Sequence, residues 1–154
     1  MYLYSLSLLA LMISTASAPA FAKDYPNGGV TGEDVVTDLK AMEDGAVLTK
    51  DSSGDPMVSA SFKIKGAEIP FQIFFYGCKE GRCSSLQYFV SFTGSPDKAV
   101  AWNSDHRFAR LYYKNGKVRV EYDVDVEIGA NSAAIQNATA RFHQLIKDAV
   151  DYAG

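Results

Sequence analysis

The sequence predicts an α+β domain, a twisted and mainly antiparallel sheet of about six strands with three helices. Most strand-like segments follow one another directly, which indicates hairpins instead of β-α-β units and places the helices on one face of the sheet. Three segments combine a helix start signal with apolar residues at helical spacing. Asn115-Gly116, between two alternating segments, is a strong hairpin signal. The predicted order of elements is α-β-β-β-β-α-β-β-α.

The first half of the domain is predicted to hold one helix and four strands. Thr31 and Asp34 form a capping box, and Gly45 stands where a C-cap glycine ends a helix. The alternating pattern of 57–65 indicates a strand with one solvent-exposed face, whereas 71–76 is apolar on both faces and is expected near the sheet centre. The helix is expected at 32–44 and the strands at 46–51, 57–65, 71–76 and 86–92.

The second half is predicted to hold a helix, a hairpin and a long final helix. The Ser-Pro-Asp sequence at 95–97 supplies an N-cap and a first-turn proline, so a helix is expected from there to about residue 105. The hairpin strands are expected at 111–113 and 118–128, the second with alternating apolar and charged residues. Asn131 or Ser132 caps the final helix, which is expected to end at about residue 152.

The first 22 residues are predicted to be a cleavable secretory signal peptide. They contain no charged side chain, and Ala20-Phe21-Ala22 forms an A-x-A cleavage site before Lys23. An uncleaved membrane anchor is the alternative, but Pro19 and the polar residues before it make a poor bilayer span. The mature protein is therefore expected to be periplasmic or secreted, without stable membrane insertion. The expected division is a signal peptide at 1–22, a flexible loop at 23–30 and an α+β domain at 31–154.

Charge and motif content narrow the function classes. The 15 Lys and Arg and 18 Asp and Glu residues give a formal charge of −3, which is not the electrostatic footprint of a nucleic-acid-binding protein. No basic run is present that would hold the chain on an anionic membrane. No serine-hydrolase elbow, zinc-protease helix or phosphate-binding loop occurs, so we predict no catalytic residue, metal or cofactor.

The two cysteines are predicted to form a disulfide. Cys78 and Cys83 enclose the four turn-forming residues Lys79 to Arg82, and strand-like runs flank both sides. A bridge across so short a loop is worth roughly 2 kcal/mol in the loop-closure model, so it would secure the hairpin tip and contribute little to the whole fold. A redox-active or metal-binding pair is the alternative, but the C-x4-C spacing differs from the C-x-x-C of those sites.

Two stretches resemble the YbjN domain family, which is described as bacterial sensory transduction regulators. One runs from Pro70 through Tyr76-Gly77-Cys78 and Gly81-Arg82-Cys83 to Tyr88, and the other is Trp102-Asn103 followed by Arg107-Phe108-Ala109-Arg110. The similarity covers about residues 31–152. The resemblance implies a fold similar to that of type III secretion chaperones, often paired into dimers, with no established catalytic residue or cofactor. It also implies a regulatory role, which fits poorly with an exported chain.

The second stretch holds several candidate interaction residues. Trp102 is expected to anchor its helix to the sheet, with ligand stacking as the alternative. Asn103 is expected to end the helix by bonding to backbone groups. Arg107 and Arg110 are able to clamp a carboxylate or phosphate, or else cap a helix or pair with acids on a neighbouring strand.

The remaining polar candidates favour ordinary structural roles. His106 and His143 have no partner at metal-ligand spacing and are expected at the surface or at helix ends. Asp123, Asp125 and Glu127 share one strand face, but steps of about 7 Å spread them too widely for one cation. We expect them to form a solvated face.

The aromatic content supports the main function hypothesis. Nine Phe and nine Tyr are present, and because two strands are apolar on both faces, some of their aromatic residues should lie opposite the helices. Phe74, Tyr76 and Tyr88 are therefore candidate interaction residues. The hypothesis is a non-catalytic periplasmic module, chaperone-like or regulatory, that binds an unknown protein partner or a second copy of itself. The alternatives are an apolar-ligand or lipid binder with a site between the sheet and the C-terminal helix, and a thiol-redox enzyme built on Cys78 and Cys83.

Overall fold

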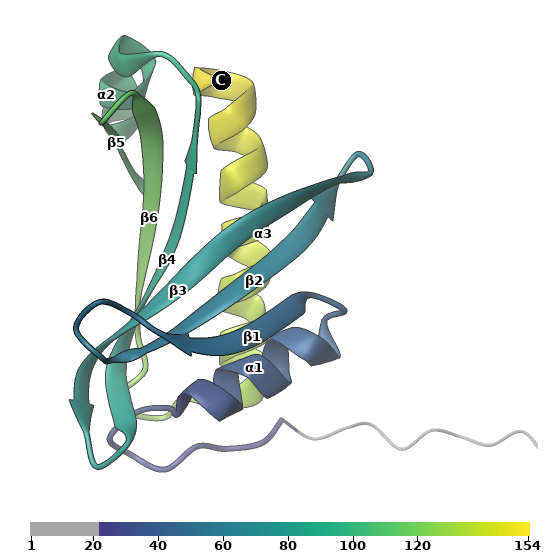
Figure 1. The fold of residues 1–154 in the computed structure, drawn as a ribbon, viewed down its shortest axis with the longest axis vertical. Coiled ribbons are helices and arrows are strands. Elements are labelled where there is room, and N and C mark those ends of the chain that lie inside the picture. Colours follow the sequence, from purple (N-terminus) through teal and green to yellow (C-terminus); the bar gives the residue numbers. More distant parts are fainter. Residues whose placement is uncertain (1–21) are drawn as a thin grey trace, which may run out of the picture.

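The computed structural model describes residues 22–154 and confirms the predicted α+β fold and its element order (Figure 1). All six strands are antiparallel to their neighbours, and their order in the sheet is β1-β2-β3-β4-β6-β5. The helices are α1 (Gly32–Ala41), α2 (Pro96–Asp105) and α3 (Ser132–Ala153). The strands are β1 (Gly45–Lys50), β2 (Pro56–Ile64), β3 (Ala67–Lys79), β4 (Arg82–Phe92), β5 (Arg110–Lys114) and β6 (Lys117–Asp125).

Three of the hairpins turn on two residues that both have positive φ. The turn pairs are Lys65-Gly66, Glu80-Gly81 and Asn115-Gly116. Positive φ at both positions is the mark of the type I′ turn, whose twist matches that of the flanking strands. The turn at Asn115-Gly116 was predicted. The four-residue loop expected between the cysteines was wrong, because Lys79 pairs with Arg82 and leaves only a two-residue turn.

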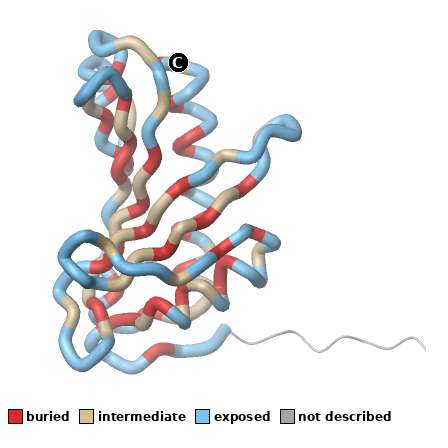
Figure 2. Tube along the Cα trace, in the orientation of Figure 1, coloured by how far each residue is buried: buried red, intermediate tan, exposed pale blue. Residues whose placement is uncertain are grey.

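The helices gather on one face of the sheet. Helix α3 crosses behind the strands and α1 lies beside its lower end, whereas α2 packs against β5 at the sheet margin (Figure 1). Buried and partly exposed residues alternate along the strands, as Figure 2 shows, because successive side chains point to opposite faces. The largest fully buried side chains include Phe75, Tyr88 and Phe142, and the rings of Tyr88 and Phe142 meet between the sheet and α3.

Helix α1 is shorter than predicted and does not use Gly45 as its cap. It ends at Ala41, and Glu43 takes the left-handed conformation at φ 65°. The amide of Glu43 donates to the Lys40 carbonyl, and the next amide donates to the Leu39 carbonyl. This pair of bonds is the Schellman arrangement, in which a glycine usually occupies the left-handed position. Gly45 instead begins β1.

The segment predicted as a flexible loop is held against the domain. Tyr25 and Val30 are buried, and Val30 exchanges backbone hydrogen bonds with Cys83 of β4. The Tyr25 hydroxyl donates to the buried carboxylate of Asp38 at 2.6 Å. The turn-forming composition of 23–30 predicted a flexible loop, but the side chains of Tyr25 and Val30 in this segment reach the core. The predicted signal peptide lies outside the described residues, except for Ala22.

Candidate functional site

The predicted disulfide is present and occupies the end of the β3–β4 hairpin. Cys78 and Cys83 face each other as paired strand residues with Cα atoms 3.9 Å apart. Cys83 is fully buried and Cys78 is partly exposed. A disulfide persists in oxidising compartments, so its presence indicates an extracytoplasmic environment. Within residues 22–154 there is no free cysteine.

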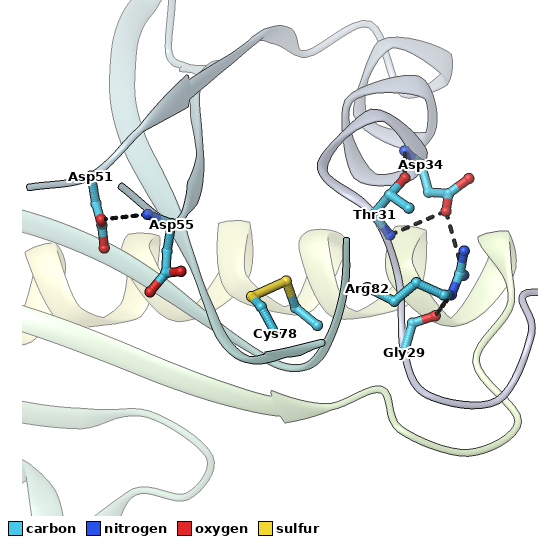
Figure 3. Close-up of a disulfide and its surroundings, with 8 residues drawn as sticks. Gly29, Thr31, Asp34, Asp51, Asp55, Cys78 and Arg82 are labelled. Atoms are coloured by element: carbon cyan, nitrogen blue, oxygen red, sulfur yellow. Dashed lines mark hydrogen bonds and ion pairs between the residues drawn. A yellow bond between two sulfur atoms is a disulfide. The ribbon is translucent and has the colours of Figure 1, made fainter. Parts of the chain in front are cut away.

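The disulfide hairpin also fastens the N-terminal segment, as Figure 3 shows. The guanidinium of Arg82 donates two hydrogen bonds to the Gly29 carbonyl, at 3.0 and 2.6 Å, and lies 3.6 Å from Asp34. Asp34 in turn closes the predicted capping box with Thr31. Hydrogen bonds from Lys23 and the Thr31 backbone lower the pKa of Asp34 in spite of its partial burial. These contacts indicate that the Cys78–Cys83 hairpin has a structural role, because it holds the N-terminal segment and the start of α1 in place.

Trp102 and Asn103 are both structural residues. Trp102 is buried, stacks on His106 at 3.6 Å and donates from its indole nitrogen to the Ala109 carbonyl at 3.1 Å. This agrees with the anchoring role and leaves no exposed ring for a partner. The Asn103 amide bonds to both backbone groups of Leu111, so it fixes α2 to the edge strand β5.

The two candidate arginines have different surroundings. Arg110 contacts Glu121 of β6, which agrees with the prediction that it pairs with an acid on a neighbouring strand. This hydrogen bond raises the pKa of Arg110. Glu121 is buried and also accepts a 2.5 Å hydrogen bond from the Tyr112 hydroxyl. Arg107 is exposed.

The strand register separates the two sheet faces, and the one turned away from the helices is named here the open face. Phe74 and Gln87 are paired across β3 and β4 on this face, and Phe89 and Glu121 are paired across β4 and β6. Tyr76 belongs to the same face and is 49% exposed. Two of the predicted interaction residues, Phe74 and Tyr76, therefore lie opposite the helices.

An aromatic–arginine cluster, defined as Phe74, Phe89, Tyr112 and Arg119, extends over the open face from β3 across β4 and β6 to the edge strand β5. The Phe74 and Phe89 rings meet edge to face with centroids 6.0 Å apart. The Arg119 guanidinium lies 5.8 Å from the centroid of Phe89 and 6.0 Å from that of Tyr112. All four side chains are only partly buried. Sequence reasoning missed Arg119 and Tyr112, although the alternation in 118–128 placed Arg119 on this face.

Tyr88 does not belong to the open face. Its side chain is fully buried and its hydroxyl is 3.0 Å from that of Thr139 in α3. Burial raises the pKa of Tyr88. Tyr88 also packs against Phe142 with ring centroids 5.3 Å apart. Protein side chains thus fill the place between the sheet and α3 where the apolar-ligand alternative put its site.

A polar pocket of about 390 Å³ at the end of α1 contains a pair that sequence reasoning missed. Asp44 Oδ2 and His143 Nε2 lie 3.0 Å apart, but the contact does not have hydrogen-bond geometry, and neither atom has another partner among the described residues. Burial raises the pKa of Asp44 to about 6 and lowers that of His143 to about 4. His143 was expected at the surface or at a helix end, but it lies in the middle of α3 and its ring stacks on Phe62 at 3.8 Å. No spacing rule could have found this pair, because the residues are 99 positions apart in the sequence.

Residues 22–154 show neither a metal-binding cluster nor a membrane-spanning helix. No group of three His, Cys, Asp or Glu side chains in this part of the chain is arranged to hold a metal ion. None of the helices described there is long and apolar enough to cross a membrane.

Comparison with known proteins gives the family. A family model described as "Putative bacterial sensory transduction regulator" matches residues 34–154. Neither the curated proteins nor the solved structures contain a match to this chain. The matched region takes in all six strands, α2, α3 and most of α1, which confirms the resemblance carried by the cysteine hairpin and the α2 sequence. The chain belongs to the YbjN family.

Proposed function

We propose that this protein is a non-catalytic, extracytoplasmic interaction module that binds a protein partner through the open face of its sheet. Membership of a family described as sensory transduction regulators fits a regulatory or interaction role. The observation that carries the proposal is the aromatic–arginine cluster, which lies on the face turned away from the helices.

The composition of the open face favours a protein as its occupant. Aromatic residues and arginine are the types enriched at binding hot spots, and here they are grouped on one surface. Arg119 lies over two aromatic rings and has no acidic partner among the described residues. A complementary partner surface would place an apolar side chain against Phe74 and a carboxylate against Arg119.

The proposed location rests on two independent features. The disulfide favours an oxidising compartment, and the uncharged first 22 residues with their A-x-A site have the properties of a secretory signal. Together they favour the periplasm or the exterior of the cell. A regulatory role would then operate through contacts made outside the cytoplasm.

Site-specific photo-crosslinking in living bacterial cells tests the proposal. A benzophenone amino acid at Tyr76, which is 49% exposed on the open face, should give a discrete crosslinked species of higher mass. The same probe at Val100, which is 69% exposed on α2, is the control and should give none. Adding Arg119→Glu to the Tyr76 probe should remove the species, because the reversed charge opposes a partner carboxylate.

Three outcomes would contradict the proposal. They are the absence of any crosslinked species at Tyr76, an identical species with the probe at Val100, and a species that survives Arg119→Glu. A crosslinked product of twice the mass of the chain would show that a second copy of this chain, and not a different protein, binds the open face.

A further inference from the structure

The two edges of the sheet are treated differently. Edge strand β5 is closed, because Asn103 bonds to the Leu111 carbonyl at 2.8 Å and accepts from the Leu111 amide at 3.0 Å. A neighbouring strand would use these same backbone groups. Edge strand β1 pairs only with β2, and among residues 22–154 no third strand or side-chain hydrogen bond reaches its outer side.

Strand β1 lacks most of the devices that usually protect an edge. Charged residues, proline and bulges discourage the addition of another strand. In β1 the only charged residue is Lys50 at its end, and its middle carries Val47 with 62% of its surface exposed. The register with β2 runs without interruption from Gly45 to Lys50, so no bulge turns the edge away.

A pocket lies beside the C-terminal end of the same strand. It has a volume of about 430 Å³ and is lined by Leu48 to Lys50 of β1, by Pro56 of β2 and by Gly81 of the disulfide hairpin. Gly32 of α1 forms another wall, where an added Cβ would lie only 2.4 Å from Leu48 Cδ1. Leu48 and Pro56 supply the apolar part of the lining, which is larger than the polar part where Glu33 and Lys50 lie, so the pocket is suited to an apolar side chain.

We propose that β1 is a strand-addition site, which binds an extended segment of another protein with one apolar side chain in the pocket beside Leu48. A whole row of backbone groups along an edge strand is complemented by another extended chain, and this requirement defines the class of occupant. The pocket supplies selectivity, since backbone pairing alone does not distinguish sequences. This site is separate from the aromatic–arginine cluster and goes beyond the proposed function.

The probe is a phage-displayed library of random peptides of about ten residues, long enough for one strand. Peptides selected on the mature protein should share an apolar position, and their binding should slow hydrogen exchange of amides in residues 45–50. Val47→Lys should weaken their binding by about tenfold or more, because a charged side chain in mid-edge discourages strand addition. Val100→Lys, at a similarly exposed position on α2, is the matched control and should leave binding unchanged.

Any of three other results would overturn the proposal that β1 is a strand-addition site. These results are a failure to select peptides, equal binding by Val47→Lys, and protection confined to residues of the open face such as Phe74 and Phe89. Dimerisation of the mature protein that Val47→Lys abolishes would assign the edge to a second copy and would likewise overturn it. Arg119→Glu should retain peptide binding, so a failure of the open-face proposal remains distinguishable from a failure at β1.

Discussion

The side-chain amide of Asn103 takes the place of a neighbouring strand at Leu111. Its nitrogen donates to the Leu111 carbonyl at 2.8 Å, and its oxygen accepts from the Leu111 amide at 3.0 Å. The same amide group donates to the Ala99 carbonyl within α2. One side chain thus joins α2 to the sheet edge and satisfies backbone groups that would otherwise be open to another chain.

We predict that Asn103→Ala lowers the free energy of unfolding by about 1–3 kcal/mol, because two backbone groups of Leu111 lose their partners. Denaturant unfolding of the purified protein measures this loss. The control is Asn27, which is exposed and whose side chain makes no hydrogen bond within residues 22–154, so Asn27→Ala should change stability by less than about 0.5 kcal/mol. Equal stability of the two variants would contradict the structural role of Asn103.

The sequence was a good guide where local chemistry decides the structure. Capping residues located the starts of α1 and α2, and Asn115-Gly116 located the last hairpin. The end of α1 was misplaced because Glu43 takes a conformation that the pattern assigned to a glycine. Residues brought together only by the fold, such as Asp44 and His143, leave no periodic signal in the chain.

The parts of the candidate site differ in how far the sequence could locate them. Phe74, Tyr76 and Tyr88 were all candidates because their strands are apolar on both faces, and such a pattern does not say which face each residue occupies. The register and the burial place Phe74 and Tyr76 opposite the helices and Tyr88 in the core. Trp102 looked like an interaction residue as well as an anchor, and burial decides for the anchor. The aromatic–arginine cluster required the register of four strands, which no single segment encodes.

A second prediction concerns the end of α1. Glu43 has φ 65°, and a residue with a Cβ atom pays about 1 kcal/mol or more for this conformation. We predict that Glu43→Gly raises the free energy of unfolding by about 0.5–1 kcal/mol. Glu43→Ala removes the same carboxylate but keeps the Cβ atom, so it should give no gain. A similar increase in both variants, measured by denaturant unfolding, would assign the effect to the charge and not to the backbone.

A third prediction concerns the disulfide. The bridge joins residues five positions apart, and so small a loop contributes about 2 kcal/mol in the loop-closure model. The Cys78→Ala/Cys83→Ala variant should therefore unfold cooperatively at lower denaturant concentration and remain folded without denaturant. Wild-type protein in a reducing agent should show a similar loss. A variant without a cooperative transition would show that the hairpin tip, with Arg82 on Gly29, supports the whole fold.

The last prediction concerns the pH dependence carried by Asp44 and His143. At neutral pH burial keeps His143 uncharged, since its pKa is lowered from 6.5 to about 4, so the pair is not an ion pair. The pKa of Asp44 is raised from 3.8 to about 6, again by burial. The folded protein therefore retains a proton on Asp44 that the unfolded chain has released between about pH 4 and 6. It also excludes a proton from His143 that the unfolded chain has bound.

These two effects have opposite signs. Stability rises with pH wherever the unfolded state binds more protons. Between about pH 4 and 6 the contribution of Asp44 falls as pH rises, and that of His143 rises, so they largely offset each other in the wild type. Asp44→Asn removes the first contribution, and the variant should gain stability relative to the wild type as pH increases from 4 to 6.

His143→Gln is the reciprocal variant and removes the second contribution, so it should lose stability relative to the wild type over the same interval. Urea unfolding at several pH values gives both differences, and the other titrating groups cancel because they are common to all three proteins. Lys147, which lies on α3 and also lowers the pKa of His143, is retained in every variant. If both variants followed the pH profile of the wild type, folding would not shift the pKa values of Asp44 and His143. The pair would then be excluded as a source of pH-dependent stability.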